Sequence, residues 1–257
     1  MKETGLKGKI ALITGGNRGL GKDVALRLAG YGSGVIITYR SHQDEAMAVV
    51  AQIEQKNQKA AAIQLDISQI NKLDEFCGQV IQQLRDVWGT ERLNFLINNA
   101  GFGGRAPIGQ TSEAVFDSLC NVHFKGVYFL TEKILPLISD NGRIVNYSSG
   151  LTRFAVPGLA AYASMKGAIE VFTKYLAKEL GSRGITANIV APGAIDNDFN
   201  KANFDAHPEI KEFLASQTAL GRIGVSEDIG GVVAFLCSED AGWVTAQRIE
   251  ASGGMFL

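Results

Sequence analysis

The stretch that decides the fold is IALITGGNRGLGKDVALRLAG, residues 10–30. Its first five residues are apolar or β-branched, which is typical of a strand that is buried on both faces. From residue 21 onward the apolar residues follow helical spacing. Gly15, Gly19 and Gly21 lie between the two parts and permit a tight turn of the backbone. The stretch therefore predicts the first strand and helix of a β-α-β unit.

Five further apolar runs repeat the character of this first strand. They lie at residues 35–38, 61–65, 95–98, 143–147 and 186–190. Segments with helical periodicity, such as 21–31 and 168–184, separate them. Strands that alternate with helices imply right-handed crossovers and a parallel sheet with helices on both faces. No Pro- or Ser-rich linker divides the chain, so we predict one doubly wound α/β domain of the Rossmann type over residues 1–257.

The segment 194–221 interrupts the alternation with short polar and helical pieces. It follows the last of the six predicted strands, and doubly wound sheets bind ligands beyond the carboxyl ends of their strands. We therefore expect this segment to be a lid over a ligand-binding crevice.

The composition narrows the class of protein. The chain is 46% hydrophobic and 20% charged with a net charge of −1, which is the profile of a soluble globular protein. Lysine and arginine are spread along the chain, so we expect no nucleic-acid or anionic-membrane partner. Cys77, Cys120 and Cys237 lack the spacing of a zinc site or a disulfide framework, and no metal site is expected. The N-terminal apolar run is too short for a signal peptide and no run approaches a membrane span, which favours a cytoplasmic location.

The glycines after the first strand follow a T-G-x-x-x-G-x-G pattern that leads into a helix. The N–H groups and the positive dipole end of that helix would meet the charge of a pyrophosphate. A purely structural turn explains the glycines alone equally well, but their place inside a β-α-β unit favours a dinucleotide. We therefore predict cofactor contacts from Gly15, Asn17, Arg18, Gly19, Leu20 and Gly21.

The end of the second predicted strand distinguishes the two nicotinamide cofactors. An acidic residue there would hold a ribose 2′-hydroxyl, whereas an arginine accommodates a 2′-phosphate. Tyr39 and Arg40 occupy the position, and Asp44 and Glu45 are judged to lie too far into the next helix. With Arg18 as a second guanidinium, the pattern favours NADP(H) over NAD(H). The alternative is that either arginine is merely solvated.

Polar residues also follow the third and fourth predicted strands. Asp66 and Ile67 come after the third strand, where the carboxylate would accept from an adenine amino group. Asn98, Ala100 and Gly101 end the fourth strand and are expected at the same crevice. Asn98 has a second interpretation, as a buried amide that ties two strands together.

Residues 160–168 read AAYASMKGA and place Tyr162 and Lys166 one helical turn apart. Their side chains therefore share a face and reach a common site. Taken alone, the pair is more simply a half-buried aromatic residue beside a surface lysine.

The chain resembles the short-chain dehydrogenase/reductase family over almost its whole length. The resemblance rests on five motifs in the family's order: TGGNRGLG at 14–21, NNAG at 98–101, SSG at 148–150, YASMK at 162–166 and APGAI at 191–195. It implies a nicotinamide-dependent oxidoreductase that acts on a small-molecule alcohol or carbonyl, and usually a homotetramer or a homodimer, of which we expect the tetramer.

The resemblance also implies roles for the catalytic residues. Ser149, with Ser148 as the alternative, would bond the substrate oxygen, and Tyr162 would exchange the proton. Lys166 would bond the nicotinamide ribose. An ammonium about 4 Å from a phenolate gains on the order of 4 kcal/mol at an effective dielectric near 20. Together with an oxidised nicotinamide, Lys166 is therefore expected to lower the pKa of Tyr162 toward neutrality.

Further positions follow from the resemblance after the sixth strand. Pro192 and Gly193 would form a turn that lets the backbone of Ile195 meet the nicotinamide carboxamide, with Asn197 in place of the family's usual threonine.

His123 departs from the family pattern. It occupies the place of an asparagine that holds a water in the family's proton relay, while Asn121 lies two residues earlier. Repulsion from Lys166 is expected to lower the pKa of His123 and keep its imidazole neutral. The alternative is a histidine that only fills or caps a helix.

The sequence thus predicts an NADP(H)-dependent reductase that interconverts a carbonyl and a secondary alcohol. A regulator that binds NADP(H) with weak or no turnover is the first alternative, and a protein that binds another adenosine ligand is the second. We expect helices around 112–138 and 161–183, and the C-terminal residues 248–257, to meet other subunits. Residues 102–110, residues 151–159 and the lid are expected to set the choice of substrate.

Overall fold

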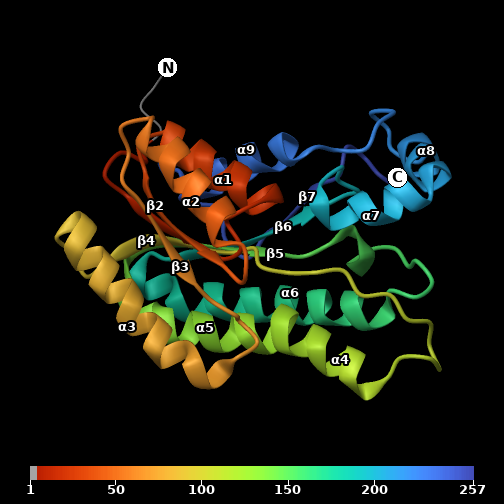
Figure 1. The fold of residues 1–257 in the computed structure, drawn as a ribbon, viewed down its shortest axis with the longest axis horizontal. Helices are drawn as coiled ribbons and strands as arrows, with labels where there is room; N and C mark the ends of the chain where they lie inside the picture. Colours follow the sequence, from red (N-terminus) through yellow and green to blue (C-terminus); the bar gives the residue numbers. More distant parts are fainter. Residues whose placement is uncertain (1–4) are drawn as a thin grey trace.

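The computed structural model describes residues 5–257, with the backbone alone at positions 199, 202 and 203. Its centre is a parallel sheet with the strand order β3-β2-β1-β4-β5-β6-β7 (Figure 1). The strands are β1 Ile10–Ile13, β2 Gly34–Tyr39, β3 Ala60–Gln64, β4 Leu93–Asn98, β5 Ile138–Tyr147, β6 Thr186–Pro192 and β7 Arg248–Ala251. The chain reverses its direction of travel across the sheet between β1 and β4, where doubly wound folds bind their ligands.

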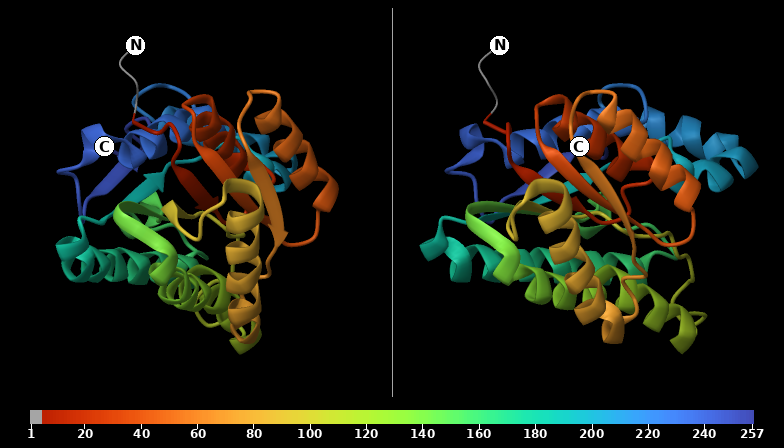
Figure 2. Two further views of the ribbon diagram at one scale, coloured as in Figure 1. Left: turned by 90° about the vertical axis from the view of Figure 1, so that its left-hand side faces the viewer. Right: turned by 60° about the vertical axis from the view of Figure 1, so that its left-hand side comes forward.

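Helices cover both faces of the sheet, as the end-on views show (Figure 2). One face carries α1 Gly19–Gly30, α2 Gln43–Glu54 and α9 Ser226–Cys237. The other carries α3 Leu73–Gln83, α4 Glu113–Cys120, α5 Gly126–Ile134 and α6 Ala160–Leu180. The predicted fold class, a doubly wound parallel sheet between two helical layers, is confirmed.

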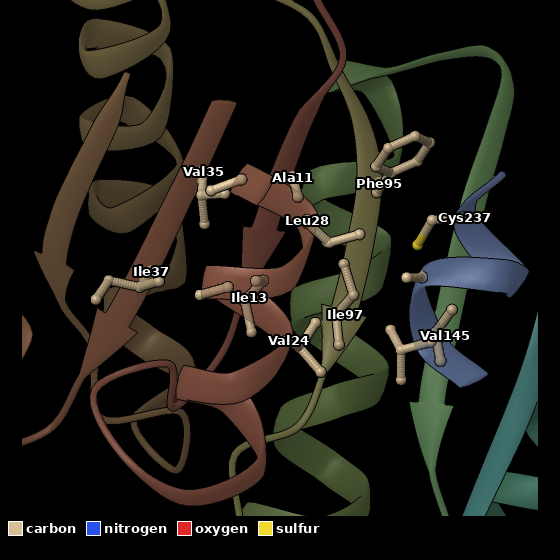
Figure 3. Packing of buried hydrophobic residues seen from close by; sticks show 14 of the residues in the cluster. Ala11, Ile13, Val24, Leu28, Val35, Ile37, Phe95, Ile97, Val145 and Cys237 are labelled. Atoms are coloured by element: carbon tan, nitrogen blue, oxygen red, sulfur yellow. The ribbon is translucent and has the colours of Figure 1, made fainter. Parts of the chain in front are cut away.

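Each face of the sheet has its own apolar core. Side chains of β1 alternate between the two, because successive residues of a strand point to opposite faces. Ala11 and Ile13 pack with Val24 and Leu28 of α1 (Figure 3). Leu12 belongs to the opposite core, under α3, α5 and α6. Burial on both faces explains why the central strands read as continuous apolar runs.

The strand register brings the ends of the central strands to one edge of the sheet. Ile13 pairs with both Ile37 and Ile97, so β1, β2 and β4 end level with one another. Pairing continues to the far edge, with Asn98 opposite Asn146 and Pro192 opposite Ala251. The segments that follow all these strands therefore emerge on the same side of the molecule.

The six predicted strands are present, and β7 is one that the sequence did not reveal. Its four residues, Arg248–Ala251, include an arginine and a glutamate, and all four are only partly buried. An edge strand with a half-exposed face lacks the apolar run that identifies a central strand.

The helix expected around 112–138 is present without a break over residues 113–137, but its type changes along its length. It consists of α4, a π-helical turn over Asn121–Lys125, α5 and a 3₁₀ turn over Leu135–Leu137. None of the described helices has the length and apolar character to cross a membrane.

The segment 194–221 contains two short helices, α7 Asp198–Ala206 and α8 Pro208–Ser216, which lie beside the C-terminus (Figure 1). Thr218 pairs with Met255, and the N–H of Phe256 donates to the carbonyl of Gln217. The lid function of this segment stays a prediction.

The apolar residues of the C-terminal tail pack largely against their own protomer. Met255 is buried and Phe256 packs on Phe154, with ring centroids 4.6 Å apart. Of the three terminal apolar residues only Leu257 is exposed, because the tail closes on its own protomer through the pairing with residues 217–220.

Candidate active site

The loop after β1 has the backbone geometry that the glycine pattern predicts. Gly15 and Gly19 have φ angles of +65° and +54°, in the left-handed region that favours glycine. A Cβ atom at Gly21 would lie 2.3 Å from the carbonyl oxygen of Gly15. The loop therefore folds closely onto the first turn of α1, and only glycine fits at its contact point.

Two polar residues that sequence reasoning missed hold this loop against the end of β4. The Thr14 hydroxyl accepts hydrogen bonds from the N–H groups of Asn99 and Ala100, at 3.0 and 2.9 Å. The Asn99 amide donates to the carbonyls of Thr14 and Gly15, at 2.9 and 3.0 Å. The available signal was the position of both residues at the ends of neighbouring strands.

The N-terminus of α1 directly follows the turn after β1 and has no side-chain cap from its N-cap residue. Its N-cap residue, Arg18, has an extended backbone and makes no side-chain cap, and the first turn carries no acidic residue. Leu20 packs partly against the core and fixes the start of the helix. This end of the helix is consequently free to meet an anion.

The two arginines predicted for a 2′-phosphate, Arg18 and Arg40, are both exposed. Tyr39 beside them is buried in the core, where it helps to position the end of β2. Arg40 lies close enough to Asp66 to lower the pKa of that carboxyl.

Glu45 corrects the judgement that the acidic residues of α2 lie too far along the helix. Its Oε2 accepts a hydrogen bond of 2.7 Å from the side-chain amide of Asn17, which lies in the loop of residues 14–21 after β1, the glycine loop. The turn between β2 and α2 is short, so the first turn of α2 comes back to the loop.

Asp66 is engaged by its own turn. Its carboxylate accepts from the N–H and hydroxyl of Ser68, at 3.0 and 2.7 Å, and from Gln69 at 3.4 Å. Burial raises the pKa of Asp66, but these hydrogen bonds outweigh it and the pKa lies below its usual value. Ile67, next to it, is buried, and its carbonyl faces Gly126 at the start of α5.

Asn98 has the geometry of the structural alternative, a buried amide that ties elements together. Its amide donates to Asn146 Oδ1 at 2.8 Å and to Thr131 Oγ1 at 3.1 Å. It is 4% exposed, so it joins β4 to β5 and α5 beneath the crevice rather than lining it.

The predicted catalytic residues come together where β5 ends and α6 begins. The side chains of Ser149 and Tyr162 are hydrogen-bonded to each other. Lys166 is buried, and its ammonium donates to the carbonyl of Tyr147 at 2.9 Å. The ammonium lies 5.7 Å from the centre of the Tyr162 ring.

Burial and a hydrogen bond act in opposite directions on the pKa of Tyr162. Burial of the hydroxyl raises it above its ordinary value, and the hydrogen bond with Ser149 offsets only part of that rise. Burial lowers the pKa of Lys166 to about 8, so the ammonium form still prevails at pH 7. The expected lowering concerns Lys166 together with an oxidised nicotinamide, and it stays a prediction; in the structure, burial of the phenol is the largest influence on this pKa.

His123 lies in the π-helical turn between α4 and α5 and is 1% exposed. Its Nε2 is 2.8 Å from the carbonyl oxygen and 3.4 Å from the nitrogen of Phe102. Its ring packs edge-on to Tyr162, with centroids 5.0 Å apart. A Cβ atom at Gly101 would lie 2.8 Å from His123 Cε1, so this glycine makes room for the imidazole.

Burial and the charge of Lys166 lower the pKa of His123 to about 3. The predicted direction and the predicted influence of Lys166 are confirmed, although burial is the larger cause. The shorter contact of Nε2 is to a carbonyl, so Nε2 carries the proton and Nδ1 is the acceptor. Nδ1 is buried without a hydrogen-bond partner among residues 5–257.

The turn after β6 lies against the turn after β7. A Cβ atom at Gly193 would be 2.9 Å from Ser252 Cα, so only glycine allows this contact after Pro192. Ile195 is buried, and its carbonyl accepts from the Asn200 amide at 2.9 Å. The Asn197 amide nitrogen lies 3.7 Å from the Cβ position at Gly19, which brings this turn to the glycine loop.

Comparison with known proteins identifies relatives along the whole chain. A family model described as enoyl-(acyl carrier protein) reductase matches residues 15–256. The 3-oxoacyl-[acyl-carrier-protein] reductase FabG of Staphylococcus epidermidis is 36% identical over 251 residues, which cover 97% of this chain and 99% of the relative.

Two solved structures are similar at comparable identity. The angucycline C-6 ketoreductase LanV with bound NADP has a TM-score of 0.93 and 36% identity, covering 98% of this chain and 96% of its own. A short-chain dehydrogenase/reductase from Serratia marcescens has a TM-score of 0.90 and 32% identity, covering 98% and 99%.

Proposed function

The chain belongs to the short-chain dehydrogenase/reductase family, and from this membership we propose that it is an NADP(H)-dependent reductase of a carbonyl to a secondary alcohol. The observation that carries the proposal is the hydrogen-bonded pair of Ser149 and Tyr162 beside the buried ammonium of Lys166. The pair lies at the carboxyl edge of the sheet, on the same side as the glycine loop.

The residues at that edge fit a dinucleotide. The contact of Gly21 with Gly15, which a Cβ would abolish, creates a backbone cradle at the uncapped end of α1. We propose that the backbone of residues 15–21 holds the pyrophosphate, that Ala100 and Gly101 border the adenosine side, and that Lys166 holds the nicotinamide ribose. The cofactor, when bound, supplies the hydride.

NADP(H) is favoured over NAD(H) by the charge at the end of β2. Arg18 and Arg40 are exposed guanidiniums on either side of the loop that would face the 2′-position. Within residues 5–257, Arg18 makes no side-chain hydrogen bond or ion pair. Glu45, in the first turn of α2, accepts a hydrogen bond from Asn17. The NADP bound to the ketoreductase LanV is consistent with this assignment.

The raised pKa of Tyr162 suits the reducing direction. At neutral pH the phenol is fully protonated and donates its proton to the developing alkoxide, while Ser149 donates a hydrogen bond to the same oxygen. The ammonium of Lys166 then stabilises the phenolate that remains.

His123 acts first as a support. Its Nε2–H holds the carbonyl of Phe102, and its ring packs on Tyr162. We propose that Nδ1, as a buried acceptor, holds a water that relays protons between Lys166 and solvent.

The segment 194–221 is proposed as the lid, since Asn197 approaches the glycine loop from it.

A homo-oligomer, most simply a tetramer, is proposed because α4, α5 and α6 expose apolar side chains. These are Val115, Phe116, Tyr128, Phe129, Val171 and Tyr175. Light scattering is expected to give a multiple of the 27.5 kDa protomer mass, and a monomer at micromolar concentration would contradict it. The cytoplasmic location stays a prediction.

The test is oxidation of NADPH with a panel of ketones that includes a 3-oxoacyl thioester and a polycyclic aromatic ketone. These two ketones correspond to the 3-oxoacyl-[acyl-carrier-protein] reductase FabG and to the angucycline C-6 ketoreductase LanV, respectively. We expect turnover with at least one class by wild type and none by Tyr162→Phe. Tight NADPH binding without turnover across the panel would instead favour the regulator.

A further inference from the structure

Glu170 lies on the same face of α6 as the catalytic pair. It follows Lys166 by four residues and Tyr162 by eight, so the three side chains are stacked one turn apart. Its Oε1 accepts hydrogen bonds from the hydroxyls of Ser148 and Thr152, at 2.6 and 2.7 Å. These two residues flank Ser149 on the chain, so one carboxylate oxygen holds both sides of the serine turn.

The same oxygen accepts a third hydrogen bond, from Arg248 Nε at 2.7 Å. Arg248 comes from β7, the edge strand, and its guanidinium makes two more contacts. Nη2 donates to the carbonyl of Ser149 at 3.0 Å, and Nη1 donates to Glu250 at 2.9 Å. The side chains of Glu170 and Arg248 are 20% and 23% exposed, so solvent competes only weakly for these contacts.

The link continues to the end of the chain. Glu250 accepts two hydrogen bonds of 2.9 Å from Arg153, and Arg153 donates to the carbonyls of Met255 and Phe256. The C-terminal tail, which pairs with the end of the segment 194–221, is thereby joined to the turn that carries Ser149.

The Ser149 hydroxyl depends on these contacts for its place. It accepts a hydrogen bond from the N–H of Leu151 at 3.3 Å and meets the hydroxyl of Tyr162. Both contacts require the backbone of Ser149 to stay extended, with φ −156° and ψ 152°. The Arg248 contact fixes the carbonyl of this residue, and the Glu170 contacts fix its neighbours.

We propose that Glu170 and Arg248 are positioning residues, which clamp the turn of Ser149 to α6 and thereby set the distance between Ser149 and Tyr162. The inference rests on the proposed reductase function, because it assigns the clamp to the hydroxyl that meets the carbonyl oxygen. Neither residue contacts the reacting atoms; both act through Ser149.

The test compares Arg248→Met with Arg183→Met, a matched control. Arg183 also bonds a carboxylate and backbone carbonyls, but at the amino end of β5, far from the serine. We expect Arg248→Met to lower kcat about ten- to a hundred-fold, the usual effect of losing charge-assisted hydrogen bonds. The Kd of NADPH and the activity of Arg183→Met are expected to change less than about two-fold.

Two further variants separate positioning from general loss of stability. In a Ser149→Ala background, Arg248→Met is expected to lower the residual kcat by less than about three-fold, since the clamp acts through the missing hydroxyl. Arg248→Lys retains the positive charge on a single donor nitrogen and is expected to recover part of the rate. A full additional loss in the Ser149→Ala background, or a wild-type kcat in Arg248→Met, would overturn the proposal.

Hydrogen exchange tests the clamp without reference to activity. The amides of Leu151 and Thr152 are expected to exchange at least ten-fold faster in Arg248→Met and in Glu170→Gln than in wild type. Unchanged exchange would overturn the clamp even if the reductase is active. If exchange is faster in the two variants but the wild-type protein reduces no ketone, the proposed function is refuted and the clamp is still supported.

Discussion

The two halves of the candidate active site differ in whether backbone or side chains form them. The cofactor half, between β1 and α1, is formed by backbone. Its glycines allow a close approach, since a Cβ atom at Gly21 would lie only 2.3 Å from the carbonyl oxygen of Gly15. The catalytic half, between β5 and α6, is made of side chains that come from the turn after β5, from α6 and from β7. The backbone geometry of the turn can be predicted from neighbouring residues in the sequence. The ion-pair network cannot, because it joins elements that are distant in the sequence and meet only in the folded protein.

The largest effect is expected in the catalytic half, from Tyr162→Phe. The change removes one hydroxyl and almost no volume, so kcat for ketone reduction is expected to fall at least about 10³-fold. The Kd of NADPH, measured by fluorescence titration, is expected to stay within about two-fold of wild type. A simultaneous loss of NADPH binding would show that the two halves are not separable.

Gly21→Ala is expected to break the cofactor half instead. The added methyl group would collide with the Gly15 carbonyl, so the loop must shift and NADPH affinity is expected to fall about a hundred-fold. Gly78→Ala is the control, because Gly78 lies in α3 with nothing within 4 Å of its Cβ position. That change is expected to stabilise the protein by about 0.5–1 kcal/mol and to leave NADPH binding unchanged. Unaltered affinity in Gly21→Ala would remove the cradle from the proposal.

Arg40→Ala sharpens the comparison within the cofactor half. We expect the Kd of NADPH to rise about ten-fold or more, since a charge-assisted hydrogen bond is lost, while the Kd of NADH changes little. Arg85→Ala, which removes an exposed guanidinium paired with Glu91, is expected to change neither. Equal binding of the two cofactors by wild type would contradict the assignment of NADP(H).

The contrast explains which parts of the molecule the sequence predicts. The six apolar strands and the positive φ angles at Gly15 and Gly19 follow from local residue types. Three other features depend on contacts between residues that are distant in the sequence. These are the hydrogen bond of Glu45 to Asn17, the edge strand β7 and the clamp of Arg248 on Ser149. The sequence also does not reveal the burial that raises the pKa of Tyr162. Its charge partner is visible at a spacing of four residues, but the burial that dominates it is a property of the packed helix.

The smallest effects are expected at His123, which belongs to the catalytic half by position and supports the loop after β4 by its hydrogen bond to Phe102. Because its pKa is about 3, the imidazole is neutral across pH 5 to 9, and it adds no inflection to the rate profile. His123→Asn is expected to retain substantial activity. His123→Leu, which cannot hold a water or bond Phe102, is expected to lower kcat several-fold at unchanged NADPH affinity.

The same pKa predicts how stability depends on pH. The unfolded chain protonates a histidine near pH 6.5, whereas the folded protein keeps His123 neutral until about pH 3, so the unfolded state binds more protons between these values. Stability from this residue is therefore complete above pH 6.5 and declines as the pH falls. Between pH 6.5 and 5 the loss reaches about 2 kcal/mol, at about 1.4 kcal/mol per pH unit. Urea unfolding at pH 6.5 and at pH 5 is expected to show a decline in stability that is smaller by this amount in His123→Asn than in wild type. An identical decline in wild type and His123→Asn would mean that His123 is protonated as readily in the folded protein as in the unfolded chain, and its place as a neutral acceptor beside Tyr162 would be lost.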